Sequence, residues 1–314
     1  MINYLGKQNA YHGEINEFIS SRYDVIALLS KGGTSEIYKA ADTTRNSKVV
    51  IKILPSRYSG VNEKRVEDGF GNTVDISHRI IEKSAELMTQ EANFLKNCHH
   101  PNIIRLRDYN LEAKRPYIVL DYLGNVTLEK EILGRKRNFT IKKTLSILTH
   151  ICSAVGYIHK KRFVYGDIKP SNIISQGQKI TLIDFGLVRP IGMPITGGTI
   201  GYMAPEVLQS DGTQVKASPT LDVYSLGILL YELLTGFHPL ASQKIYGARN
   251  HYSFDSRSIK DKGAIPSLAS RLNPNLPKAF DEILLRCINK NPRERYQNLD
   301  TLLLDFEKAA GKVI

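Results

Sequence analysis

Cysteine is scarce in this sequence of 314 residues, which has three: Cys98, Cys152 and Cys287. Three widely separated cysteines, each beside apolar residues, argue against disulfides and a cysteine-rich metal site, so we expect core thiols. No run of 18 or more apolar residues occurs, the richest stretch being residues 226–234. The first ten residues, MINYLGKQNA, lack a signal-type apolar segment. We therefore expect a cytoplasmic protein without a membrane span.

Acidic residues are the minority charge, with 31 Asp and Glu against 43 Lys and Arg, a net charge of +12. The basic residues form two clusters: Lys130, Arg135, Lys136, Arg137, Lys142 and Lys143, and Lys160, Lys161 and Arg162. Such clusters can hold nucleic acid, an anionic lipid surface or an acidic substrate. No nucleic-acid motif or basic-aromatic interleaving accompanies them, so we expect a solvated surface and no nucleic acid. An acidic substrate or an anionic surface remains the alternative.

Residues 164–186, VYGDIKPSNIISQGQKITLIDFG, gather most of the chemistry that the sequence presents. The Gly-Asp-Ile-Lys-Pro-Ser-Asn run is rich in turn-forming residues and predicts a loop. Apolar residues on both sides of a Gln-Gly-Gln turn then predict a hairpin of two short strands that leads into Asp184. Folding of this hairpin would bring Asp184 near Asn172 and Asp167.

Oxygen-bearing side chains gathered at one place suit a hard divalent cation. Mg²⁺ takes one or two carboxylates and completes its shell with water and substrate phosphates, which predicts Asn172 and Asp184 as ligands, with Mn²⁺ as an alternative metal. Asp167 is then left to orient a hydroxyl nucleophile. The Lys169 ammonium would neutralise a transferring phosphoryl group.

The motif D-I-K-P-S-N, followed twelve residues later by D-F-G, resembles the catalytic loop and the metal-binding motif of protein kinases. Either motif alone is short enough to occur by chance, but their order and spacing favour the resemblance. It implies ATP as the phosphoryl donor. It also implies an α+β, bilobal protein-kinase-like fold, with an antiparallel sheet plus one helix in the N-terminal lobe and a mainly helical C-terminal lobe.

Alternating apolar and polar residues from Tyr23 to residue 54 predict three strands. The first turn, in residues 30–37, resembles the glycine-rich phosphate loop of bacterial Ser/Thr protein kinases, although serines stand at two of the usual glycine positions. The following V-V-I-K motif resembles the strand that carries the nucleotide-binding lysine, with valine replacing the usual alanine. The resemblance implies these nucleotide contacts: Ser30, Lys31, Gly32, Gly33, Ile37, Val50 and Lys52.

Residues 55–84 are polar and glycine-bearing, and we expect an insertion there. Apolar residues at helical spacing begin near Ser77: Ile81, Met88, Ala92 and Leu95. Glu91 lies on the same inward stripe, and a buried carboxylate needs a partner. The resemblance supplies Lys52, because a lysine–glutamate pair positions the lysine on the nucleotide phosphates. Glu86 is the nearest rival.

Residues 120–124 resemble the hinge whose backbone binds adenine. The resemblance implies further nucleotide contacts from Leu120, Asp121 and Leu123 of the hinge, and from Ile174 in the strand that follows the catalytic loop.

Residues 140–160 predict a core helix through six apolar residues: Leu145, Leu148, Ile151, Ala154, Val155 and Ile158. His159, near its end, is expected to be structural.

Residues Thr196 to Glu206 resemble the end of a kinase activation segment, with the sequence T-G-G-T-I-G-Y-M-A-P-E. The resemblance implies that Thr199 hydrogen-bonds Asp167 and Lys169, and with Lys169 it points to Ser/Thr substrates; mere autophosphorylation of Thr199 is the alternative. Gly166 stands where most protein kinases have the arginine that pairs with a phosphorylated activation loop, so we expect activity without that phosphorylation.

Two residues, Asp222 and Arg295, are expected to have scaffold roles. Asp222, in an apolar helix that starts at Pro219 and ends at Gly236, is expected to accept N–H bonds from the catalytic-loop backbone. Arg295 is expected to hold Glu206 in place.

These observations predict an N-terminal extension in residues 1–21 with a short helix at 13–19, an N-terminal lobe in 22–123, a C-terminal lobe in 124–314, and no regulatory domain. The expected function is a Ser/Thr protein kinase that acts on protein substrates, with ATP-Mg²⁺ bound between the lobes. The alternatives are a pseudokinase scaffold and a small-molecule kinase of related fold.

Overall fold

The computed structural model describes residues 15, 17–55, 65–67, 73–75, 77–134, 138–195, 197–208, 214–240 and 266–312. They divide into an N-terminal unit, Met1–His99 with Ile104–Leu123, and a C-terminal unit, His100–Ile103 with Gly124–Ile314. Residues 13, 14 and 16 of the helix expected at 13–19 lie outside the described residues, as do Thr196 and three members of the basic clusters, Arg135, Lys136 and Arg137.

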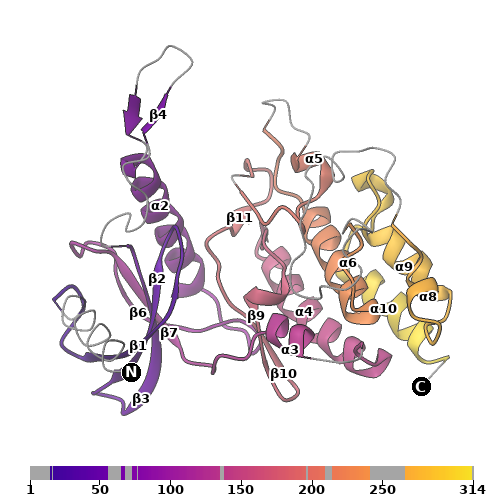
Figure 1. The fold of residues 1–314 in the computed structure, drawn as a ribbon, viewed down its shortest axis with the longest axis horizontal. Coiled ribbons are helices and arrows are strands. Elements are labelled where there is room, and N and C mark those ends of the chain that lie inside the picture. The colour runs from indigo at the N-terminus through magenta and orange to yellow at the C-terminus, as the bar shows by residue number, and fades with distance from the viewer. Residues whose placement is uncertain are drawn as a thin grey trace. The chain divides into compact units, whose positions relative to one another are not determined.

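The N-terminal unit is built on a five-stranded sheet with the order β1-β2-β3-β7-β6, in which every neighbouring pair is antiparallel (Figure 1). Its strands are β1 (Tyr23–Lys31), β2 (Glu36–Asp42), β3 (Ser47–Ile53), β6 (Leu106–Asn110) and β7 (Tyr117–Asp121). Strict alternation in β3 buries Val49, Ile51 and Ile53 on one face and leaves Val50 and Lys52 on the other. The predicted strands are confirmed.

Helix α2 (Ser77–Lys96) packs against β6 and β7 of this sheet and begins where the apolar spacing predicts it. Met88, Ala92 and Leu95 are buried. Ile81, expected on the same stripe, is 37% exposed, so the buried face begins later than the sequence suggests. Two short strands, β4 (Arg65–Glu67) and β5 (Thr73–Asp75), pair within the expected insertion and lie beyond the first turn of α2 (Figure 1). No pattern in the sequence predicts this pair of strands, and residues 77–84 of the expected insertion are helical.

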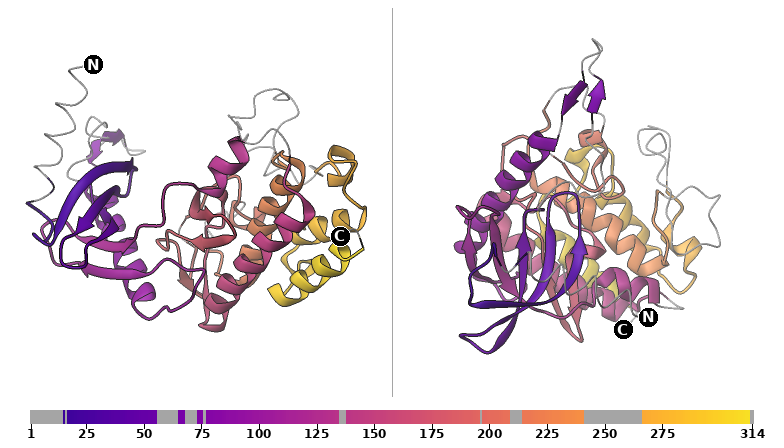
Figure 2. Two further views of the ribbon diagram at one scale, coloured as in Figure 1. Left: turned by 90° about the horizontal axis from the view of Figure 1, so that it is seen from below. Right: turned by 60° about the vertical axis from the view of Figure 1, so that its left-hand side comes forward.

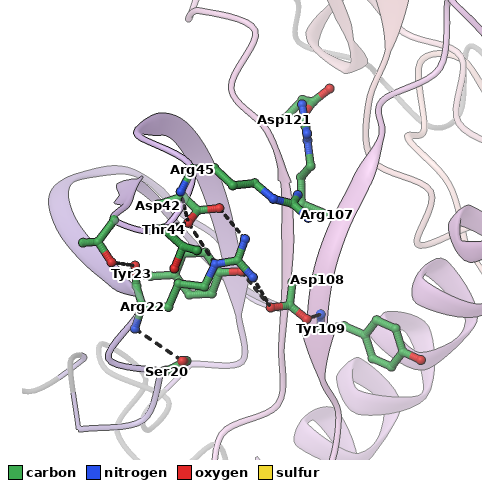
Figure 3. Close-up of polar contacts among 11 residues, drawn as sticks. Ser20, Arg22, Tyr23, Asp42, Thr44, Arg45, Arg107, Asp108, Tyr109 and Asp121 are labelled. Atoms are coloured by element: carbon green, nitrogen blue, oxygen red, sulfur yellow. Dashed lines mark hydrogen bonds and ion pairs between the residues drawn. The ribbon is translucent and has the colours of Figure 1, made fainter.

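The residues before β1 pack onto the sheet. Ile15 and Ile19 join the apolar cluster formed by Tyr38, Ile51 and other side chains of the sheet, and Phe18 packs against it. Polar contacts fasten the entry to β1, as Figure 3 shows: Arg22 binds Asp42 through two hydrogen bonds of 2.8 and 2.6 Å, and the Tyr23 hydroxyl donates to Asp108. The described part of the predicted extension therefore belongs to the N-terminal core.

The C-terminal unit is mainly helical. Its helices are α3 (Leu128–Gly134), α4 (Ile141–Lys160), α5 (Pro205–Leu208), α6 (Pro219–Thr235), α8 (Ala269–Leu272), α9 (Ala279–Cys287) and α10 (Leu299–Ala310). Short strands pair as β8 (Phe163–Val164) with β11 (Arg189–Pro190), and β9 (Ile173–Gln176) with β10 (Lys179–Leu182). One-turn helices lie at Pro170–Asn172 and Pro292–Glu294. The hairpin predicted after the catalytic loop is the β9–β10 pair.

Helices α4 and α6 form the centre of this unit. The α4 helix packs against α6 and α10, and α6 packs against α9 (Figure 2). Thr140 caps α4 by accepting a hydrogen bond from the Lys143 N–H, and Gly236 ends α6 with a φ of 77° that suits glycine. The inward face of α4 uses Ile147 rather than the expected Leu145, which is half-buried.

Cys98, Cys152 and Cys287 are buried, and none of the three forms a disulfide, as the sequence predicts. Burial raises the pKa of both the Cys152 and Cys287 thiols far above the ordinary value. Within the described ranges, every helix is too short or too polar to span a bilayer.

Candidate active site

The glycine-rich loop joins β1 to β2. The N–H of Gly32 donates to the carbonyl of Ser35 at 2.9 Å, and Ser30 pairs with Ile37 across the base. The loop itself is solvent-exposed between Lys31 and Thr34. The Lys31 ammonium, predicted to contact nucleotide, lies 3.0 Å from a Glu36 carboxylate oxygen. Exposed backbone in a tight, glycine-bearing turn is suited to approach by an anion.

Lys52 and Glu91 form the ion pair that the resemblance implies. The Lys52 Nζ lies 2.7 Å from Glu91 Oε2. The Glu91 side chain is fully buried on α2, whereas the rival Glu86 is exposed. Because a buried carboxylate without a cation is costly, this pair fixes both the lysine side chain on β3 and the helix beside it.

Strand β7 leads into the expected hinge. Leu120 is buried and lies opposite Val50 of β3. The N–H of Asp121 donates to the carbonyl of Arg105 at 3.1 Å, and its carboxylate pairs with Arg107. A ligand contact from the Asp121 backbone would therefore use its carbonyl. Leu123 is half-buried at the end of this segment.

In the C-terminal unit, four predicted side chains form one closed network. Asp167 accepts hydrogen bonds from the Thr199 hydroxyl on Oδ1 at 2.9 Å and from the Asn172 amide on Oδ2 at 2.8 Å. Lys169 contacts the same Oδ2 at 2.7 Å and donates to the Thr199 hydroxyl at 2.8 Å. The contacts expected of Thr199 are thus present. This network presents one carboxylate and one ammonium side by side.

The hairpin brings Asp184 to the end of β10. The N–H of Ile183 donates to the Asn172 carbonyl at 2.9 Å, and the Phe185 ring packs edge-on against Tyr165 with centroids 5.1 Å apart. Asp184 is exposed and has a φ of 63°, an uncommon conformation for a non-glycine residue. Ile174 is buried in β9.

The oxygens of Asn172 and Asp184 would suit a cation that also binds substrate oxygens. Within the described part of the chain, no three His, Cys, Asp or Glu side chains form a metal-binding group. The Asn172 side-chain nitrogen donates to the Asp167 carbonyl and carboxylate. The side-chain oxygen of Asn172 therefore points away from Asp167. One carboxylate and one amide oxygen fit Mg²⁺, whose remaining positions are filled by water and phosphate.

Asp222 supports the catalytic loop from α6. Its side chain accepts hydrogen bonds from the N–H groups of Tyr165 and Gly166 at 2.9 and 2.8 Å, as predicted. His159 Nε2 lies 2.8 Å from the same carboxylate, which is the structural role expected for it. Gly166 has a φ of 81°, and a Cβ at this position would lie 2.9 Å from the Leu187 carbonyl oxygen. This backbone therefore favours glycine.

Buried polar side chains of the C-terminal unit contact the end of the segment that resembles an activation segment. Arg295 is 1% exposed and binds Glu206 through two contacts of 2.7 Å, as the resemblance implies. The Tyr202 hydroxyl donates to Glu232 at 2.6 Å, and the His238 ring bonds the Gly201 carbonyl at 2.9 Å.

Glu232 and His238 belong to none of the motifs that the sequence presents. Burial raises the pKa of Glu232 to about 8, and burial lowers the pKa of His238 to about 4. An acidic residue inside the apolar run of α6 was the available signal for Glu232.

Comparisons with known proteins agree with this arrangement. The chain matches the protein kinase domain over residues 23–305. It is 30% identical over 302 residues to the serine/threonine-protein kinase PrkC of Bacillus subtilis, across 94% of this chain and 41% of PrkC. It is 28% identical over 302 residues to the serine/threonine-protein kinase PknL of Mycobacterium tuberculosis, across 94% of this chain and 67% of PknL. The chain thus spans about two fifths of the length of PrkC.

Proposed function

The chain belongs to the protein kinase family, and on that premise we propose that it transfers the γ-phosphoryl group of ATP to serine and threonine hydroxyls of proteins. The observation that carries the proposal is the network of Asp167, Lys169, Asn172 and Thr199. It supplies a carboxylate to orient a hydroxyl and an ammonium to meet a transferring phosphoryl group.

In the transfer step, the substrate oxygen forms a bond to the γ-phosphorus and the bond from that phosphorus to the β,γ-bridging oxygen breaks. Asp167 orients the attacking hydroxyl and accepts its proton, and the leaving ADP retains the bridging oxygen. Lys169 neutralises charge on the phosphoryl oxygens. ATP with Mg²⁺ supplies the activated phosphoryl group when bound, and Asn172 and Asp184 are the residues that would hold the metal.

In the N-terminal unit, Lys52 would bind the α- and β-phosphates, because Glu91 fixes its ammonium at the end of a rigid strand. The exposed loop of Gly32 and Gly33 would cover the phosphates, and Leu120 would line the adenine site. That Lys52 and Asp184 act on one nucleotide stays a prediction.

Preference for serine and threonine rests on Lys169 and its contact with Thr199. Protein substrates, rather than small molecules, are favoured by the Arg295–Glu206 pair, because it braces the segment on which a peptide would lie. An acidic substrate or anionic surface for the basic side chains around Lys130 and Lys160, and a cytoplasmic location, stay predictions.

We also propose that activity does not require phosphorylation of the activation segment. Gly166 supplies no guanidinium to clamp a phosphate, and its left-handed backbone beside the Leu187 carbonyl disfavours a larger residue. Thr196→Ala is expected to retain activity. Complete loss in Thr196→Ala, restored by Thr196→Asp, would contradict this part of the proposal.

The test is transfer of labelled γ-phosphate from Mg-ATP to a panel of protein substrates, with mass-spectrometric mapping of the modified residues. Wild type is expected to label serine and threonine, and Asp167→Ala to label neither. Label that persists in Asp167→Ala would expose a contaminating kinase. Nucleotide binding without transfer to any protein would favour a pseudokinase scaffold, and transfer confined to small molecules would favour the related small-molecule kinases.

A further inference from the structure

A buried carboxylate lies directly behind the glycine-rich loop. Glu36 is the first residue of β2, and its side chain is 4% exposed. Three side chains contact the two carboxylate oxygens: Lys31 Nζ at 3.0 Å from Oε1, and Arg115 Nη2 at 2.8 Å and the Tyr38 hydroxyl at 3.1 Å from Oε2. Lys31 ends β1 and Glu36 begins β2, so their contact spans the base of the loop.

Arg115 holds this carboxylate from the opposite side. It lies in the turn between β6 and β7 and is buried. Its Nε and Nη2 also donate to the Leu54 carbonyl, at 2.9 and 2.6 Å, just after the end of β3. The guanidinium lies over the Phe18 ring, 5.3 Å from its centroid. The base of the loop is thereby tied to the C-terminal end of β3, whose last residue pairs with Glu36, and to the segment that precedes β1.

The carboxylate is ionised when it makes these contacts. Burial alone would raise the pKa of Glu36, but hydrogen bonds from Lys31 and Arg115 outweigh burial and hold its pKa below the ordinary value. A charge that is buried and bound on both oxygens is a fixed point, because breaking the cluster would leave Arg115 without its anion.

We propose that Glu36 is a positioning residue for nucleotide binding: it fixes the glycine-rich loop by holding Lys31 at the loop's base, while Arg115 fixes Glu36. This deepens the proposed function and rests on it. The loop backbone can bind phosphates only in a narrow range of shapes, and an anchored base reduces the entropy lost when it closes on them. Lys31 on this view acts through Glu36 rather than by touching the nucleotide.

The chain offers a matched control at the other end of the same strand. Asp42 ends β2, its side chain is 1% exposed, and it binds Arg22 by two hydrogen bonds (Figure 3). Glu36→Gln and Asp42→Asn therefore each remove one buried charge that pairs with an arginine, one beside the glycine-rich loop and one remote from it.

The experiment measures calorimetric affinity for the non-hydrolysable analogue Mg-AMP-PNP and the thermal unfolding midpoint of each variant. Both variants are expected to unfold at a lower temperature. Only Glu36→Gln should lose affinity, by about tenfold, the size of one charged hydrogen bond. Equal losses of affinity in the two variants, or none in Glu36→Gln, would overturn the proposal while leaving the proposed function intact. A wild-type chain that binds no nucleotide would overturn both.

A double-mutant cycle separates anchoring from direct contact. Lys31→Gln should reduce affinity, and the Lys31→Gln/Glu36→Gln double variant should be no weaker than the worse single variant. Additive losses would mean that Lys31 binds the nucleotide independently, contrary to the proposal. Should Glu36→Gln fail to fold, Glu36→Asp, which keeps the charge but shortens the side chain, takes its place in both measurements with the same expectations.

Discussion

The buried carboxylates described in the N-terminal unit contact lysine or arginine. Two in the C-terminal unit differ: Glu232 accepts a hydrogen bond from a tyrosine hydroxyl, and Asp222 accepts two from backbone N–H groups and lies beside the His159 ring. Hydrogen bonds from Arg22 hold the pKa of Asp42 below its ordinary value, while burial raises that of Glu232 to about 8. The difference follows from what each unit must fix. Charge pairs place long side chains such as Lys52 on a sheet, and hydrogen bonds to Asp222 place the backbone of a loop.

This contrast has an energetic consequence. Removing one partner of a buried charge pair leaves the other charge uncompensated, which costs several kcal/mol. Removing a carboxylate that binds backbone N–H groups strands neutral donors, which costs about 1–3 kcal/mol each, and also frees the loop that it held. Mutations in the two units should therefore separate nucleotide affinity from the rate of transfer.

The largest effect is expected at Asp167. Asp167→Asn keeps the shape of the side chain but removes the charge that faces Lys169 and the acceptor for a substrate proton, so kcat should fall about 10³-fold. Affinity for Mg-AMP-PNP should change little. The measurement is steady-state transfer to a protein substrate, with the exposed Asp24→Asn as control. A kcat within tenfold of wild type would remove Asp167 from the reaction.

The next effect is expected at Asp222, which never meets substrate in the proposed mechanism. Asp222→Asn retains one acceptor oxygen for the two N–H groups of Tyr165 and Gly166, and the free energy of unfolding should fall by about 2–3 kcal/mol. Because the loop that carries Asp167 is loosened, kcat should fall while the ATP KM stays near wild type. A rise confined to the ATP KM would contradict the division of roles between the units.

A smaller effect, of the opposite kind, is expected at Glu91. Glu91→Gln removes the anion that holds Lys52, and kcat/KM for ATP should fall about 30-fold, mainly through KM. Glu86→Gln is the matched control, since Glu86 lies on the same helix and is exposed. If both variants behaved alike, the Lys52–Glu91 pair would have no role in nucleotide binding.

The contacts that the sequence predicts are those in which a short motif or a recognisable helix identifies each partner. Motif order identifies both partners of the Asp167–Thr199 bond. The Lys52–Glu91 pair and the Asp222 cap each join a motif residue to an acidic residue of a predicted helix. The β9–β10 hairpin is predicted for a local reason, since its turn residues and apolar strands adjoin.

The contacts that escape prediction join a motif residue to a residue in no motif. Arg115 lies in a polar turn, and nothing in its neighbours indicates burial beside Glu36. His238 follows α6 and meets Gly201 only in the folded chain. Ile81 shows the converse, because its helical spacing is correct but the core does not extend to it. Periodicity gives the side of a helix, and tertiary packing decides how much of that side is covered.

The smallest effect tests the contrast in charge directly through pH. Glu232 ionises near pH 4.5 when unfolded, but burial raises its pKa in the folded chain to about 8, so between these values the folded state binds the extra proton. Stability from this group is complete below pH 4.5 and is lost as pH rises toward 8. His238, with its pKa lowered from 6.5 to about 4, has the opposite slope below pH 6.5 and none above it. Between pH 6.5 and 8, wild type should therefore lose about 1 kcal/mol per pH unit relative to Glu232→Gln, measured by chemical denaturation. A difference that is independent of pH in this window would mean that Glu232 is already ionised in the folded chain, and the contrast with the ionised carboxylates of the N-terminal unit would not hold for this residue.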